Sequence, residues 1–150
     1  MFGFFKFKKT VDYATKYVLT MIAPAQQTAA LRQTGFPNAV FADAYILGFL
    51  QILVMHAANE SQGKALQASH QKMVFEGVLN QLVPGLGQQM EMALMQLNTL
   101  GVRGNENYLV GRREAHEYVR ALMSGDDANA QRISLAFTDF IKRNHLGLSK

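Results

Sequence analysis

Histidine and glutamate side chains are the groups in this sequence best suited to hold a metal ion or a haem. His56 and Glu60 are four residues apart, so on a helix they would share one face and could ligate a single ion. A di-iron helical bundle needs the spacing Glu-x-x-His twice, and this spacing occurs nowhere in the chain. His116 fits a charged helix face, and His70 fits an apolar stripe, where a hydrogen-bonded core histidine is the commoner case. We therefore expect no metal and no cofactor.

Motifs of enzyme active sites are absent from the sequence. It contains no glycine-rich phosphate loop, no Gly-x-Ser-x-Gly elbow and no His-Glu-x-x-His pair of metal ligands. The adjacent carboxylates Asp126 and Asp127 follow a glycine, as at the start of a helix, so we interpret them as a helix cap. The chain has no cysteine, which excludes disulfides and thiolate chemistry. The sequence therefore favours a protein that is not an enzyme.

Basic side chains gather on one predicted helix, over residues 108–123. Arg113, Glu117 and Arg120 have spacings that place them on one face of this helix, where each ion pair would contribute a few tenths of a kcal/mol. We interpret these ion pairs as structural by default. Arg112 adds a further positive charge and leaves this face slightly basic, which is compatible with an acidic partner.

A small apolar ligand is the main alternative to a protein partner. A carrier would hold such a ligand in a pocket between helices, with His56 or His70 as the polar anchor. The chain has eight methionines, with Met90, Met92 and Met95 clustered, and flexible methionine side chains can line an adaptable groove. Filling gaps in a helical core is the more common use of methionine.

The formal net charge of +4 is unevenly distributed along the chain. Residues 1–75 contain seven lysines and arginines against three acidic residues, whereas residues 76–150 contain eight of each. A balanced second half does not provide the broad basic surface of a nucleic-acid-binding protein, so we expect no nucleic-acid partner. Only 17% of the residues are charged, against roughly 25% in typical domains, which leaves room for a protein interface.

The chain begins with an aromatic and basic segment, residues 1–9. Four phenylalanines and three lysines lie in it, namely Phe2, Phe4, Phe5, Phe7, Lys6, Lys8 and Lys9. We expect an N-terminal arm that packs on a hydrophobic groove of the helical body. A contact with a protein partner or a membrane surface is the alternative, with the phenylalanines inserted and the lysines near anionic headgroups. The segment is not a secretory signal, so the expected location is cytoplasmic.

Residues 39–58 are predicted to form the central helix. Their only strongly polar side chains are Asp43, Gln51 and His56, which fall at about 0°, 80° and 220° around a helix and so form no polar stripe. A helix that is apolar nearly all round must be covered nearly all round. Its length of about 30 Å would suit a bilayer, but the three polar side chains and weakly basic flanks favour a buried core helix.

Amphipathic patterns predict further helices around this centre. One begins at Thr10 and is either kinked at Pro24 or followed there by a second helix. Others are expected over residues 64–82, 88–100, 108–123 and 127–145, with an exposed loop over residues 101–107. No segment shows the alternation of a strand. The predicted fold is all-α, with residues 10–150 as a single compact bundle of five to seven helices around residues 39–58.

These observations favour one function over two alternatives. We predict a non-catalytic adaptor or regulatory protein, cytoplasmic and bacterial, that binds a protein partner and forms homodimers or larger homo-oligomers. The candidate contact residues come from the arm and from the central helix: Phe4, Phe5, Phe7, Lys8, Lys9, Tyr45, Phe49 and Met55. The alternatives are the carrier of an apolar ligand and, less favoured, a metal- or haem-binding helical protein.

Overall fold

The regular structure in the described part of the chain is helical. The computed structural model describes residues 7–33, 35–87 and 106–148, and these ranges contain five α-helices, one short 3-10 helix and no strand. The elements in chain order are α2 (Lys8–Leu31), η1 (Asn38–Ala42), α3 (Ala44–Gln62), α4 (Ala68–Leu82), α6 (Glu106–Ser124) and α7 (Asp127–His145). The predicted all-α fold is confirmed. The helix expected over residues 88–100, with its methionine cluster, lies outside the described residues, as does most of the loop over 101–107.

α2 is one long helix that continues through a proline. It begins two residues before the expected start at Thr10 and contains Pro24 in its interior, so no second helix begins there. Proline cannot donate a backbone hydrogen bond, and its ring crowds the preceding turn. Met21, Ile22 and Ala25, on both sides of the proline, are buried in the core. This packing stabilises the helix across a residue that would end an isolated one.

The central helix begins later than the sequence predicts. Instead of one helix over residues 39–58, the structure has η1 followed by α3, with Asp43 between them. The Asp43 carboxylate accepts hydrogen bonds from two backbone N–H groups of the first turn of α3, at 2.9 and 3.3 Å. A capping residue has a non-helical backbone, so Asp43 ends one helix and starts the next. At the far end, Gly63 takes a left-handed conformation, with φ of 70°, and ends α3.

The remaining helices follow their predicted ranges with small differences. α7 has the expected bounds, and the Asp126 side chain accepts a backbone hydrogen bond at 3.2 Å, which confirms its interpretation as a cap. α4 begins four residues later than expected. Asn59 accepts a hydrogen bond from the backbone of Leu66 at 2.9 Å and thereby stabilises the connection as a loop. α6 exceeds its predicted range by two residues at the start and one at the end.

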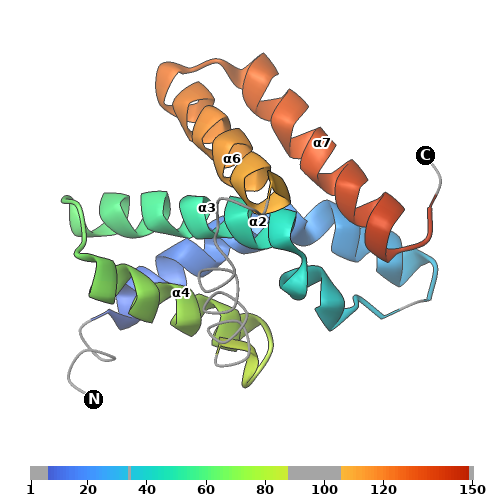
Figure 1. The fold of residues 1–150 in the computed structure, drawn as a ribbon, viewed down its shortest axis with the longest axis horizontal. Helices are drawn as coiled ribbons and strands as arrows, with labels where there is room; N and C mark the ends of the chain where they lie inside the picture. Colours follow the sequence, from blue (N-terminus) through green and yellow to red (C-terminus); the bar gives the residue numbers. More distant parts are fainter. Residues whose placement is uncertain (1–6, 34, 88–105, 149–150) are drawn as a thin grey trace.

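α3 lies at the centre of the bundle. It packs against α2, α4 and α6, and its contact with α6 is the most extensive between described helices. Figure 1 shows α4 on one side of α3 and the α6–α7 pair on the other. Ile46, Leu50 and Leu53 are fully buried, which confirms the prediction of a buried apolar central helix. Within the described ranges, no helix has the length and apolar character needed to cross a membrane.

α3 and α6 cross in direct backbone contact at two glycines. A Cβ atom added to Gly48 would lie 2.2 Å from the carbonyl oxygen of Tyr108, and one added to Gly111 would lie 2.0 Å from the carbonyl oxygen of Tyr45. Real Cβ atoms essentially never lie within 3.0 Å of another heavy atom, so both distances are sterically forbidden. The atoms in the way belong to the backbone of the other helix, which cannot rotate aside as a side chain can. Ala115, one turn after Gly111, is fully buried and continues the line of small residues. The crossing therefore requires glycine on both helices.

Replacing Gly48 with alanine tests this contact through the free energy of unfolding. The change alone would gain about 1 kcal/mol of helix propensity, so an open site would be stabilised. At the crossing, the added methyl group must displace a helix backbone, which costs more than the roughly 1–3 kcal/mol of ordinary overpacking. We expect Gly48→Ala and Gly111→Ala each to lower the free energy of unfolding by about 2 kcal/mol or more, measured by urea denaturation with far-UV circular dichroism.

The matched control is Gly35→Ala. An added Cβ at Gly35 would meet no atom within 4 Å, so its effect should stay within about 0.5 kcal/mol. A Gly48→Ala variant as stable as the Gly35→Ala control would contradict the backbone contact.

Candidate functional site

The structure describes only the end of the predicted N-terminal arm. Phe4 and Phe5 lie outside the described residues. Phe7 is only 2% exposed and packs into the core just before α2, with its ring 4.8 Å from the ring of His70. Lys8 and Lys9 are exposed in the first turn of α2. Phe7 thus contacts the chain's own core, while the two lysines are accessible to a partner.

The two aromatic candidates on the central helix are buried by the chain itself. Tyr45 stacks on Phe140 of α7, with ring centroids 4.3 Å apart, and Phe49 lies 4.4 Å from Phe137 of the same helix. The Tyr45 hydroxyl donates to Glu114 Oε1 of α6 at 2.7 Å. Burial, and then this hydrogen bond, raise the pKa of Tyr45 far above its usual value, so the hydroxyl stays a neutral donor. A partner could reach these rings only if α6 or α7 moved.

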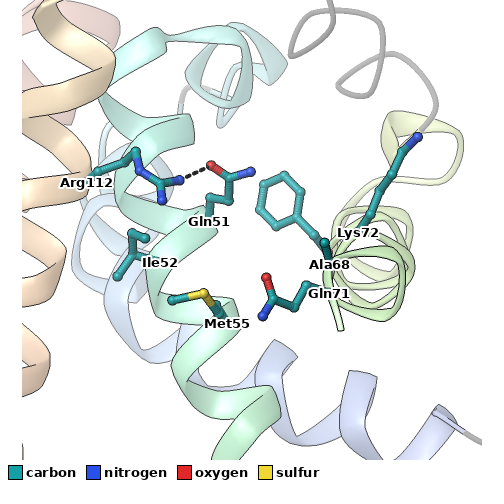
Figure 2. A pocket seen from close by; sticks show the side chains of 8 residues that line it. Gln51, Ile52, Met55, Ala68, Gln71, Lys72 and Arg112 are labelled. Atoms are coloured by element: carbon teal, nitrogen blue, oxygen red, sulfur yellow. Dashed lines mark hydrogen bonds between the residues drawn. The ribbon is translucent and has the colours of Figure 1, made fainter. Parts of the chain in front are cut away.

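Met55, the third candidate on α3, lines a cavity of about 230 Å³ between α3, α4 and α6. Figure 2 shows its side chain facing Gln71 of α4, with Gln51 and Arg112 at the opposite end. Gln51 Oε1 accepts hydrogen bonds from the Tyr108 hydroxyl and from Arg112 Nη1, the latter at 2.5 Å. The cavity therefore joins an apolar wall to a hydrogen-bonded polar end that sequence reasoning missed, since residues of three helices build it.

The two histidines proposed as ligand anchors lie in different places. His70 lines a second cavity, of about 280 Å³, beside the connection between α3 and α4. His56 lies on α3 against α2, where its ring meets that of Tyr17 edge-on with centroids 6.1 Å apart. The structure does not bring the two histidines to one pocket.

His56 belongs to a polar cluster that joins α2 to α3. Its Nε2 lies 3.5 Å from Glu60 Oε2, so the predicted proximity of this pair is confirmed. Glu60 Oε1 accepts hydrogen bonds from the hydroxyls of Tyr13 and Tyr17, the latter at 2.7 Å. The tyrosines were not predicted as part of this site, because their i, i+4 spacing on α2 does not reveal which helix they face. The cluster joins the N-terminal part of α2 to the C-terminal end of α3.

The tyrosines also favour the ionised form of this carboxylate. Their hydrogen bonds lower the pKa of Glu60 below its usual 4.5; partial burial opposes this, and the charge of His56 adds a smaller lowering. Burial, followed by the hydrogen bond to Glu60, raises the pKa of Tyr17. The ionised carboxylate is thus occupied by two neutral donors. No group of three or more histidine, aspartate or glutamate side chains in the described ranges is arranged to hold a metal.

The outer face of α6 carries a row of exposed side chains. Leu109, Arg113, His116, Arg120 and Met123 follow one another at intervals of three or four residues, so they form one stripe, here called the α6 stripe. Neither Arg113 nor Arg120 forms an ion pair or a hydrogen bond within the described part of the chain, although both have ion-pair spacing to Glu117.

The α6 stripe keeps a positive electrostatic environment. Burial, followed by the charges of Arg112 and Arg120, lowers the pKa of His116 below its usual 6.5. Glu114 accepts a hydrogen bond from Tyr45, and Glu117 forms no ion pair with either arginine in the described part of the chain. The cationic groups of the stripe are therefore available to an anion from outside the described chain.

Comparisons with known proteins give no independent information on this site. No family model matches the chain, and searches of curated proteins and of solved structures find no match. The functional interpretation rests on the geometry of the described residues.

The cluster around Glu60 predicts a pH-dependent contribution to stability. Because the folded pKa lies below the unfolded value, the contribution is fully present above about pH 4.5 and is lost as the pH falls through the lower folded pKa. We expect Glu60→Gln to be less stable than the wild type at pH 7, with a difference that shrinks below about pH 5. Urea denaturation over a pH series measures this difference.

Glu117→Gln is the control for that series. Glu117 lies on α6 and has no hydrogen bond or ion pair within the described part of the chain. The free energy of unfolding of Glu117→Gln, relative to the wild type, should not change with pH as it does for Glu60→Gln. A Glu60→Gln deficit of the same size at pH 3 and pH 7 would show that the carboxylate's ionisation does not stabilise the fold.

Proposed function

We propose that this protein is a non-catalytic interaction protein that binds an acidic segment of a protein partner along the α6 stripe. The observation that carries the proposal is the alignment of Arg113, His116 and Arg120 on one exposed helix face, without carboxylate partners in the described chain. Unpaired guanidinium groups on a surface favour carboxylates, which they can bind through two parallel hydrogen bonds.

Exposed apolar side chains at both ends of the α6 stripe support a protein partner. Leu109 is 40% exposed and Met123 is 75% exposed. The 14 intervals between these two residues correspond to about 21 Å of helix, enough to seat several turns of a partner helix or a short extended segment. A partner with acidic residues at its centre and apolar residues at both ends would match this order of side chains.

Charge distribution favours an acidic protein segment over nucleic acid. α6 carries Glu106, Glu114 and Glu117 as well as its arginines, so its basic character is confined to one narrow stripe. Nucleic-acid binding usually draws on many lysines and arginines spread over a face. A single row of two arginines, with His116 between them, suits a partner with a few carboxylates.

Self-association is a separate prediction, made from the apolar central helix. In the described structure, α2, α4 and α6 cover that helix, so it needs no second copy for burial. A homodimer would use another surface, such as the α6 stripe. The cytoplasmic and bacterial assignments likewise stay predictions.

A synthetic peptide tests the proposal directly. The probe is a fluorescein-labelled helical peptide with glutamates spaced i, i+3 and i+7 and a leucine at each end, measured by fluorescence anisotropy. We expect binding that weakens with salt, because exposed charges are screened. Arg113→Glu/Arg120→Glu replaces attraction by repulsion at two sites and should weaken binding about tenfold or more, since surface charge pairs contribute up to about 1 kcal/mol each.

The control variant makes the same charge change elsewhere. Lys16→Glu/Arg132→Glu alters exposed residues of α2 and α7, so it should keep wild-type affinity after correction for net charge. If both variants lose the same affinity for the peptide, net charge alone explains the effect and the proposal is contradicted. Tighter binding of a DNA duplex than of the peptide would also contradict it. Sedimentation velocity on the same variants shows whether a second copy occupies the stripe.

A further inference from the structure

Arg112 brings an unpaired positive charge to the cavity between α3, α4 and α6. No carboxylate in the described ranges lies within ion-pair distance of it. Its hydrogen bonds to Gln51 Oε1 and to the Tyr108 hydroxyl oxygen, at 2.5 and 3.2 Å, both come from Nη1. The other N–H groups of this guanidinium have no protein acceptor in the described chain, and its planar fork matches the two oxygens of a carboxylate.

Gln51 adds a second donor at the same end of the cavity. An arginine can only donate, so the amide oxygen of Gln51 must face Arg112 and the amide nitrogen must face the other way. Figure 2 shows this nitrogen directed into the cavity, toward α4. It has no hydrogen-bond partner among the described residues, and the Tyr108 hydroxyl holds the amide in this orientation.

The rest of the cavity is mostly apolar. Ile52 and Met55 of α3 line one side of the cavity, and Ala68 and Phe75 of α4 line the other. Figure 2 shows Met55 and Gln71 at the end opposite Arg112. Lys72 lies at the edge of the cavity, with its side chain directed away from Gln51 (Figure 2). The volume of about 230 Å³ is below the roughly 300–1,000 Å³ of sites for drug-sized ligands, so the occupant must be small.

We propose that this cavity binds a small monocarboxylate with a short apolar chain. Arg112 and the Gln51 amide nitrogen hold the carboxylate, and Ile52, Met55 and Phe75 contact the chain. Two donors and no acidic group at the polar end select an anion, while the apolar walls exclude a fully hydrated ion such as sulfate. This site does not depend on the α6 stripe, because Arg112 turns toward α3 and Arg113 toward the exterior.

Octanoate, octan-1-ol and sulfate are the probes, added to the full-length protein and followed by ¹H–¹⁵N NMR. The side-chain amide signals of Gln51 and Gln71 report occupancy of the cavity directly. We expect octanoate to shift both signals in a saturable manner, and octan-1-ol to bind at least about tenfold more weakly, since hydrogen bonds to a charged group are lost. Sulfate should shift neither signal.

Three variants separate the carboxylate contact from the fold. Arg112→Gln should weaken the binding of octanoate about tenfold and leave the binding of octan-1-ol unchanged. Arg113→Gln, on the outer face of α6, should change the binding of neither probe. Arg112 also joins α6 to α3, so its replacement is accepted only with an unchanged circular dichroism spectrum. Ala68→Leu fills the cavity from α4 without touching the polar end and should abolish binding of both probes.

Three results would overturn the proposal. They are octanoate and octan-1-ol binding equally, octanoate binding unchanged in Ala68→Leu, and saturable shifts confined to residues outside the cavity. A loss of peptide binding to the α6 stripe with octanoate binding intact would count against the proposed function alone.

Discussion

The close backbone contact that α3 and α6 make at Gly48 and Gly111 determines where α6 lies on the central helix. At this crossing the two backbones approach too closely for any side chain between them. The polar contacts on either side depend on that separation: Tyr45 reaches Glu114, and Gln51 reaches the Tyr108 hydroxyl and Arg112. The same crossing turns one edge of α6 toward the cavity and leaves the opposite edge exposed. Both proposed binding surfaces therefore follow from one helix contact.

The scattered polar residues of the central helix each attach it to a different neighbour. Asp43 Oδ2 lies 2.9 Å from Nε2 of His145 in α7. Gln51 accepts a hydrogen bond from Arg112 of α6, and the pair His56 and Glu60 faces α2. A helix surrounded on several sides has no single solvent face on which polar residues could gather. The absence of a polar stripe in the sequence thus reflects burial all round. Asp43, Gln51 and Glu60 each have a hydrogen-bond partner on another helix.

Much of the fold was predictable from the sequence because local patterns determine it. α7 has a clear apolar stripe, a capping aspartate and a final glycine, and its predicted bounds are correct. The predicted start of the central helix was wrong because Asp43 was taken as an interior residue, whereas its side chain caps α3. Pro24 was expected either to kink the helix or to start a second one, and the second alternative was wrong because tertiary packing outweighs the local cost of the proline. The glycine contact and the cavity were not predictable, because they depend on which helices meet.

The most direct test of this account is the approach of each glycine to the backbone of the opposite helix in solution. In a ¹⁵N- and ¹³C-resolved NOESY spectrum, backbone contact at the crossing predicts cross-peaks from the Hα protons of Gly48 to backbone protons of residues 108–112, and from those of Gly111 to residues 45–49. Side-chain contacts alone cannot produce this pattern. Cross-peaks that link the helices only through side chains, in a protein with helical chemical shifts for both segments, would contradict the crossing and the two surfaces derived from it.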